Sequence, residues 1–516
     1  MDILLGSVNI EVSLLCLFAY MSAITVLTII IIYFMVLMGI MYLTSKGATN
    51  ETFFVGERKS PWHIVAYGMI GASLSGVTFI SVPGWVEGSQ FSYMQMVLGY
   101  LVGYFVIAYV LLPIYYKLNL TSIYTYLEQR FGVISHKTGA IIFLGSRVLG
   151  ASVRILLVAS VLDAFVLSQW NVPFEVTVIA SIALIWVYTN RGGIKTIIWT
   201  DTLQTTFMII AVIVACIVVA DQLDLFSKGV FSSIVNSEYS QIFFFEDINA
   251  KSHFLKYFLG GMFITIGMTG LDQDMMQKNL TCKSLKDAQK NMIFFSVILV
   301  FVNLLFLGMG ALLYMYSNST GIGQGVDSAD HLFPSIALAS ETGNILAILF
   351  IIGLIAAAYS SADSALTSLT TSISFDLLNI EKKEKKQQNT LRKRVHVGVS
   401  LLLILVVLIL KKYTDKSAID ALMFFAGFTY GPLIGIFAFG ILTKRHISDL
   451  LVPILSIISI GISVLLSLYS KGGKLVDEGA PGILGDYVLG HELIIINAFI
   501  TFILLIGFSK KAKLVV

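Results

Sequence analysis

The sequence predicts an all-α membrane protein with about 13 transmembrane helices. Of its 516 residues, 57% are hydrophobic and 13% are charged, whereas soluble domains carry about 25% charged residues. Apolar runs recur along the whole length, for example Val26–Met41, Phe294–Leu313 and Val399–Leu410. Since a helix needs about 20 mostly apolar residues to cross a bilayer, we expect a multi-pass protein whose main surroundings are the lipid bilayer.

The hydrophobic runs, read against their breakers, give thirteen expected spans. They cover about residues 23–43, 63–84, 91–116, 138–168, 174–189, 196–220, 255–271, 290–316, 343–367, 396–410, 418–441, 447–469 and 490–508. With the N-terminus outside, the inner loops hold most of the 34 Lys and Arg residues. Because these residues concentrate in cytoplasmic loops, we expect the N-terminus out and the C-terminus in. The basic loop between spans nine and ten could also bind lipid headgroups.

Glycine and proline interrupt the second and seventh expected spans. The second carries Gly68, Gly71, Gly76, Pro83 and Gly84, and the seventh carries Gly260, Gly261, Gly267 and Gly270. Five spans lie from the first of these up to the second, which is the spacing of two inverted five-helix repeats with broken first helices. Glycines that only allow close helix packing are the alternative.

This repeat divides the chain into six predicted segments. They are an N-terminal extension (1–22), a first transmembrane helix with its inner loop (23–62), a first five-helix repeat (63–220), an outer loop (221–254), a second five-helix repeat (255–441) and two C-terminal transmembrane helices (442–516). A clean helix pattern begins just after Met21, so Met21 is an alternative start. The beginning lacks a basic region, so we expect no cleaved signal peptide.

One face of the ninth span is polar. On a helix, Asp363 falls within an arc of roughly 160° together with six hydroxyl residues, namely Ser360, Ser361, Ser364, Thr367, Ser368 and Thr371. Neutral oxygens can hold a small monovalent cation with few carboxylates, so this face favours sodium over calcium. The alternative is that these hydroxyls bond back to their own helix carbonyls.

Four charged residues are candidates for a position deep within the hydrocarbon region, where each costs about 2.5–3.5 kcal/mol unless it has a partner. They are Arg147, Arg154, Asp201 and Asp363. Asp201 could form a structural pair with Arg147, or it could share a second cation with Asp363. Arg147 and Arg154 lie about 10 Å apart on one helix face and cannot serve one small anion. Arg154 stands near the midplane with no obvious acid at that depth, so it could bind a carboxylate of an incoming anion, or instead pair with Asp163 or helix-end carbonyls.

Several functional classes lack support in the sequence. Cys16, Cys216 and Cys282 are widely spaced, which predicts neither a disulfide framework nor a zinc site. Walker A, HExxH and nucleophile-elbow motifs are missing, as is the Gly-x-Gly-Asp sequence of intramembrane proteases, so we expect no enzyme and no cofactor. A net charge of +3 does not suggest nucleic acid as a partner.

Four motifs in this order resemble the sodium–solute symporter family. They are Gly71–Gly76 with Pro83-Gly84, the stretch from Gly192-Gly193 to Gln204, Asp272-Gln273 with Gln277, and Ser360–Asp376. The likeness runs from about Ile24 to the eleventh span. It implies an inverted-repeat transporter of the plasma (inner) membrane that takes up a small organic solute with sodium by alternating access.

The resemblance also implies ion ligands. One sodium would bind the carbonyls of Gly76, Phe79 and Ala357 and the hydroxyls of Ser360 and Ser361. Some members bind a further sodium with residues that align with Asp201, Asp363 and Ser364. In this sequence Asp363 replaces a hydroxyl residue, so that place could hold sodium, a proton or a salt bridge.

The solute site implied by the resemblance is a midplane cavity lined by Thr78, Ser81, Gln95 and Arg154, with Phe424 and other aromatic residues of the eleventh span as a lid. The sugar-transporting branch has a lysine in the span aligned with the eighth and a glutamine in the one aligned with the eleventh. Here the eighth span offers Asn303, and the eleventh reads Phe424–Tyr430. Sialic-acid carriers of the family use an arginine in the fourth span, which favours a carboxylate-bearing solute such as a sialic acid. One alternative is a sodium-coupled carrier of a neutral sugar or polyol, and another is a channel or solute sensor on the same scaffold. The sequence does not predict the oligomeric state.

Overall fold

The computed structural model describes residues 23–163, 167, 170–326, 328–412, 418–477 and 480–511, with side chains in the eleventh span from Ala426 onward. Residues 1–22, with Cys16 and the alternative start at Met21, lie outside these ranges, and so does the side chain of Phe424. Within the described ranges the regular elements are helices, joined by a few isolated β-bridges such as Ser60 with Cys282.

Each expected span overlaps one helix or two successive helices of the described chain, and two of these successive pairs are bent by more than 40°. In chain order these are α2 (Ala23–Thr44), α4 (Trp62–Ser73) with α5 (Gly76–Gly84), α7 (Tyr93–Val106) with α8 (Leu112–Lys117), α10 (Val133–Leu162), α11 (Phe174–Gly192), α12 (Ile194–Gln222), α15 (Phe254–Thr265) with α16 (Gln273–Asn279), α17 (Leu285–Thr320), α19 (Asn344–Ser372), α20 (Lys385–Lys411), α21 (Ala418–Leu442), α22 (Leu451–Tyr469) and α23 (Leu493–Gly507). Short helices connect them: α3 (Asn50–Val55), α6 (Val86–Ser89), α9 (Thr125–Arg130), α13 (Leu225–Lys228), α14 (Val230–Val235) and α18 (Leu332–Ala337).

The helices of the described chain are apolar and long enough for a membrane protein. By length and composition, eight can cross a bilayer, or ten if each bent pair is one span. Two shorter apolar helices, Ala426–Leu442 and Leu493–Gly507, follow near the C-terminus. The all-helical membrane fold is therefore confirmed, while the count of thirteen spans, the repeat and the orientation stay predictions.

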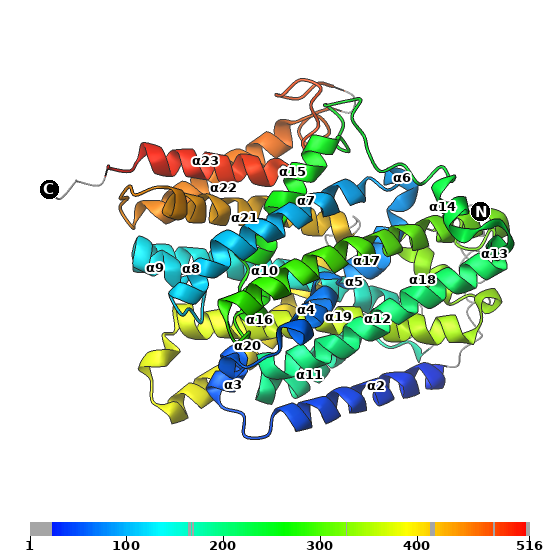
Figure 1. Cartoon of the computed structure of the whole chain (residues 1–516), viewed down its shortest axis with the longest axis horizontal. Coiled ribbons are helices and arrows are strands. Elements are labelled where there is room, and N and C mark those ends of the chain that lie inside the picture. The colour runs from blue at the N-terminus through cyan, green and yellow to red at the C-terminus, as the bar shows by residue number, and fades with distance from the viewer. Residues whose placement is uncertain are drawn as a thin grey trace.

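Helix α10 runs through the middle of the bundle, where it contacts α19, α20 and α21 (Figure 1). The C-terminal helices α22 and α23 pack against each other and against α21 at one edge, and α2 lies at the opposite edge beside α11 and α12. Nearly all of α10 from Ser146 to Leu162 is buried, so the two arginines of this helix point into protein and not into lipid.

Close packing brings the first half of the broken second span against α12. A Cβ added at Gly71 would lie 2.1 Å from the Thr205 hydroxyl oxygen and 3.3 Å from the Thr205 Cα. Glycine at this position thus lets the backbones of α4 and α12 approach, as small residues do at helix contacts in membranes. The contact places Asp201, one turn before Thr205, beside the broken helix.

We expect Gly71→Ala to lower the melting temperature of the purified protein, because the new methyl group must displace Thr205 at a typical cost of about 1–3 kcal/mol. Gly145→Ala is the matched control, since Gly145 lies in α10 with nothing within 4 Å of an added Cβ. Thermal unfolding in detergent measures both. An equal melting temperature for Gly71→Ala and the wild type would contradict the packing argument.

Candidate ion and solute sites

Both interrupted spans are bent, as the glycine pattern predicts. The axes of α4 and α5 differ by 53°, and those of Phe254–Gly270 and α16 differ by 69°. At the first break, Leu74 leaves the helical region with φ −82° and ψ 74°, and Ser75 is extended. Breaks of this kind free backbone carbonyls that an ion or solute can use.

The predicted sodium ligands lie where α5 meets α19. The two helices are in contact, and a Cβ added at Gly353 of α19 would lie 2.9 Å from the ring of Phe79. Within α5, Pro83 has no N–H, so the carbonyl of Phe79 lacks its usual donor four residues on. The hydroxyl oxygen of Ser361 is buried and has no hydrogen-bond partner among the described residues. A bare carbonyl and a bare hydroxyl therefore occur on the two helices that the sodium site needs.

Asp201 has protein partners on both carboxylate oxygens. The Lys278 Nζ lies 2.7 Å from Oδ2, and the Ser360 hydroxyl donates to Oδ1 at 2.6 Å. The side chains of Asp201 and Lys278 are each only 1% exposed. The alternative in which Asp201 pairs with Arg147 is therefore wrong, because Asp201 pairs with Lys278 of α16.

Asp363 and its neighbours keep free oxygens. Tyr188 of α11 donates a hydrogen bond of 2.8 Å to Asp363 Oδ2. Among the described residues, Asp363 Oδ1 and the hydroxyl oxygens of Ser364 and Thr367 are buried without a partner. Some other hydroxyls of this helix do bond back to carbonyls, as Ser368 does to Ala365. The polar face of α19 thus carries both hydroxyls that donate to carbonyls of the same helix and buried hydroxyls without a hydrogen-bond partner among the described residues.

Arg147 of α10 forms buried ion pairs with two acids at the start of α16. Its guanidinium contacts the Asp274 carboxylate directly and lies 3.9 Å from Asp272 Oδ2. Tyr430 of α21 donates a hydrogen bond of 2.5 Å to the same Asp272 oxygen. Both acids lie at the start of α16, Asp272 as its N-cap and Asp274 in its first turn, so this cluster ties the second broken span to α10 and α21.

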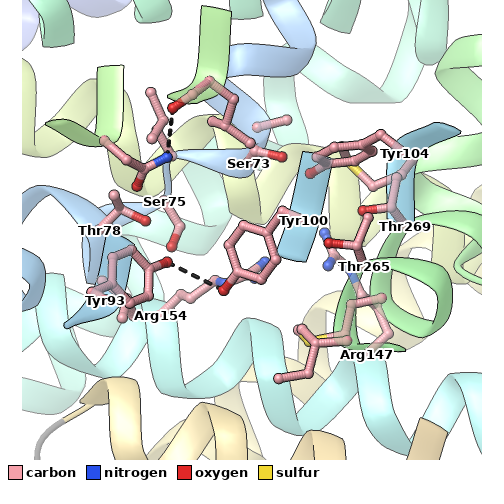
Figure 2. Close-up of a pocket in the computed structure, with 18 residues that line it drawn as sticks. Ser73, Ser75, Thr78, Tyr93, Tyr100, Tyr104, Arg147, Arg154, Thr265 and Thr269 are labelled. Atoms are coloured by element: carbon pink, nitrogen blue, oxygen red, sulfur yellow. Dashed lines mark hydrogen bonds between the residues drawn. The ribbon is translucent and has the colours of Figure 1, made fainter. Parts of the chain in front are cut away.

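A cavity lies between the two broken spans, and Arg154 lines it (Figure 2). Its empty space is about 750 Å³, including the part that is open to solvent. The polar lining residues are Ser73, Ser75, Thr78, Tyr93, Tyr100, Tyr104, Arg147, Arg154, Thr265, Thr269 and Asn303. Arg154 is 7% exposed and forms no ion pair within the part of the chain that the structure describes. The cavity therefore combines one uncommitted cation with many hydroxyl groups.

The structure brings together only part of the predicted solute set. Thr78 and Arg154 line the cavity. Ser81 is buried without a hydrogen-bond partner but is not among the lining residues. Gln95 instead holds the loop that precedes α15, since its amide donates to the Ser252 carbonyl at 3.0 Å and accepts from the Phe244 N–H at 3.2 Å.

Sequence reasoning missed three tyrosines of α7 that form one wall of the cavity. Tyr93 and Tyr100 share a hydrogen bond of 3.3 Å, and Figure 2 shows their hydroxyls meeting beside Arg154. Tyr104 lies farther along the same wall. Spacings of seven and four residues put all three on one helix face, and this periodicity was a signal that could have found them.

The different partners of the two arginines give opposite expectations for stability. Arg147→Met leaves two buried carboxylates without their cation, and breaking a buried pair typically costs about 3–5 kcal/mol. We therefore expect a large fall in melting temperature. Arg154→Met is the matched control on the same helix, and it should leave the melting temperature unchanged or raise it, because it removes a buried charge that has no acid partner. Equal losses for both variants would contradict this assignment of partners.

Comparisons with known proteins place these features in a family. The chain matches the model of the sodium:solute symporter family over residues 53–449. The sodium/sialic acid symporter SiaT of Proteus mirabilis is 24% identical over 467 residues, covering 88% of this chain and 90% of that protein. The sodium/sialic acid symporter NanT of Aliivibrio fischeri is 24% identical over 442 residues, covering 84% and 83%.

A solved structure has the same fold. It is the substrate-bound outward-open state of a Na⁺-coupled sialic acid symporter, with a TM-score of 0.79 and 21% identity over 94% of this chain and 99% of that chain. The family match covers well over half of the sequence, and the relatives are transporters and not enzymes. The chain belongs to the sodium:solute symporter family and is a sodium-coupled transporter of a small organic solute.

Proposed function

We propose that this protein takes up a carboxylate-bearing solute together with sodium, with a sialic acid as the first candidate. The observation that carries the proposal is Arg154, a buried guanidinium without an acid partner in the described structure, on the wall of the cavity between two broken helices. A guanidinium stays charged and binds a carboxylate through two parallel hydrogen bonds. The names of the relatives SiaT and NanT favour a sialic acid, and the many hydroxyl groups of the cavity suit a polyhydroxylated body.

The coupling sodium binds, in this proposal, between α5 and α19. Its ligands are the carbonyls of Gly76, Phe79 and Ala357 and the hydroxyls of Ser360 and Ser361. The bare Ser361 oxygen and the proline opposite the Phe79 carbonyl support this set. Because the ligands belong to a broken helix and to a helix packed on it, movement of one against the other would open and close the ion site together with the cavity.

The same proposal gives the protein two inverted five-helix repeats, over residues 63–220 and 255–441, in the plasma (inner) membrane with its N-terminus outside. Bends at the start of both segments support it, since transporters of this architecture open each repeat with a discontinuous helix. The first helix (23–62) and the two C-terminal helices (442–516) would then flank the transport core. Rocking of the repeats around the cavity would provide alternating access.

Ser361→Ala tests the sodium site in proteoliposomes. Loss of one of five ligands should raise the sodium concentration for half-maximal uptake by about tenfold, equivalent to about 1.4 kcal/mol. Ser368→Ala on the same helix is the matched control, since its hydroxyl is engaged with the Ala365 carbonyl, and we expect it to keep the sodium dependence of the wild type. Wild-type uptake that runs equally well when choline replaces sodium would contradict sodium coupling altogether.

Arg154→Lys tests the solute class through uptake of radiolabelled sialic acid. Because lysine cannot form the paired hydrogen bonds of a guanidinium, the Michaelis constant should rise by about 10- to 100-fold, as expected for a lost charged hydrogen bond of about 1.5–3 kcal/mol. Sodium binding should persist. The sialic acid methyl ester, which lacks the charge, should compete poorly with the acid in the wild type.

Two outcomes would favour the alternatives. If Arg154→Ala transports sialic acid with an unchanged Michaelis constant, Arg154 does not bind the solute. If the methyl ester competes as well as the acid, the site does not recognise the carboxylate, which favours a neutral sugar or polyol. If sealed vesicles show no accumulation above the external concentration under a sodium gradient, the protein acts as a channel or solute sensor on this scaffold.

A further inference from the structure

Asp201 already has a cation of its own. The Lys278 ammonium lies 2.7 Å from Asp201 Oδ2, and both side chains are almost fully enclosed. The other oxygen, Oδ1, accepts from the Ser360 hydroxyl at 2.6 Å. Neither oxygen of this carboxylate is therefore bare, unlike Oδ1 of Asp363 or the hydroxyl of Ser361.

The pair lies directly next to the proposed sodium site. Ser360 is one of the sodium ligands of that proposal and also the donor to Asp201. Lys278 reaches this place from α16, the second half of the broken seventh span, whereas Asp201 belongs to α12 and Ser360 to α19. An ammonium group and a sodium ion both carry one positive charge, so the ammonium meets the electrostatic need that a second sodium at Asp201 would otherwise meet.

We propose that Lys278 is the resident cation of Asp201 and takes the place of a second exchangeable sodium, so that one sodium ion binds per protein. The proposal rests on the sodium site between α5 and α19. It explains why the carboxylate is tolerated at this depth in the absence of a second ion, since isolated charges within the membrane are costly.

The charges around the site agree with a single ion. Lys278 contributes one positive charge, and Asp201 and Asp363 contribute two negative charges when ionised, which leaves one net negative charge. Asp274, a further acid that interacts with this pair, contacts Arg147 directly. Asp363 is three residues from Ser360, and residues at this spacing have Cβ atoms about 5–6 Å apart on a helix. One sodium at Ser360 and Ser361 balances the remaining charge.

The number of ions can be counted without knowing the solute. Binding of ²²Na⁺ to the purified full-length protein should saturate at one ion for the wild type and for Lys278→Arg, which keeps the charge. Lys278→Met removes the resident cation, so a second sodium should bind and the count should rise to two. Two ions in the wild type, or an unchanged count of one in a folded Lys278→Met protein, would overturn the proposal.

A double variant provides a test that does not depend on the stability of Lys278→Met. Asp201→Asn leaves the ammonium uncompensated beside Ser360, so sodium affinity should fall by at least about tenfold through charge repulsion in the protein interior. Asp201→Asn combined with Lys278→Met restores the net charge, and sodium affinity should return to near the wild-type value. If Asp201 were itself a sodium ligand, the double variant would stay as weak as Asp201→Asn, and the proposal would fail.

The same experiment separates this proposal from the sodium site on which it rests. Ser361→Ala should weaken ²²Na⁺ binding in both the wild type and the double variant. If it leaves binding unchanged in both, the site between α5 and α19 is wrong, whatever the ion count shows. If it weakens binding while the count in the wild type is two, the sodium site stands and the role of Lys278 fails.

Discussion

The interruption of two helices inside the bilayer is the constraint on which the rest of this structure depends. Lipid offers no hydrogen bonds to a free carbonyl, so a broken helix survives only where protein or a water-filled cavity surrounds the break. Here both breaks border the same cavity. Gly71 lets α12 close over the first break, and the cluster of Arg147 with Asp272 and Asp274 holds the second. The features that make the breaks tolerable also bring the ion and solute groups together.

Some buried charged side chains of this core have a partner of opposite charge, and others do not. Arg147 is paired with Asp274, and Lys278 with Asp201. Among the described residues, Arg154 has no acid partner, and one oxygen of Asp363 has no donor. Since an unpaired charge at membrane depth is costly, Arg154 is the place where an exchangeable anion gains most, and the Asp363 carboxylate adds negative charge one helical turn from Ser360 of the proposed sodium site. Their opposite signs match the symport of an anionic solute with sodium.

Hydrophobic runs were sufficient to locate the long apolar helices of the described chain, and glycine positions located both breaks, because these signals are local along the chain. The bare hydroxyls of α19 and the free guanidinium of Arg154 also followed from helical spacing and depth. The partners of Asp201 and Arg147 did not follow. The seventh expected span ends near 271, whereas the chain continues as α16, which turns by 69° and stays buried. A turn of this size depends on tertiary packing, which periodicity along one helix does not report.

One sodium per cycle has a definite energetic consequence. With a neutral solute, a sodium ion entering down a tenfold gradient and 100 mV supplies about 1.4 plus 2.3 kcal/mol, which supports accumulation of about 500-fold. With a singly charged anion the ion and solute charges cancel, so the membrane potential contributes nothing and accumulation is limited to about tenfold by the same gradient. A resident ammonium at Asp201 therefore makes anion uptake electroneutral and independent of the membrane potential. The loaded and the empty carrier then bear the same net charge, so the electrical work of the two directions of the conformational cycle cancels.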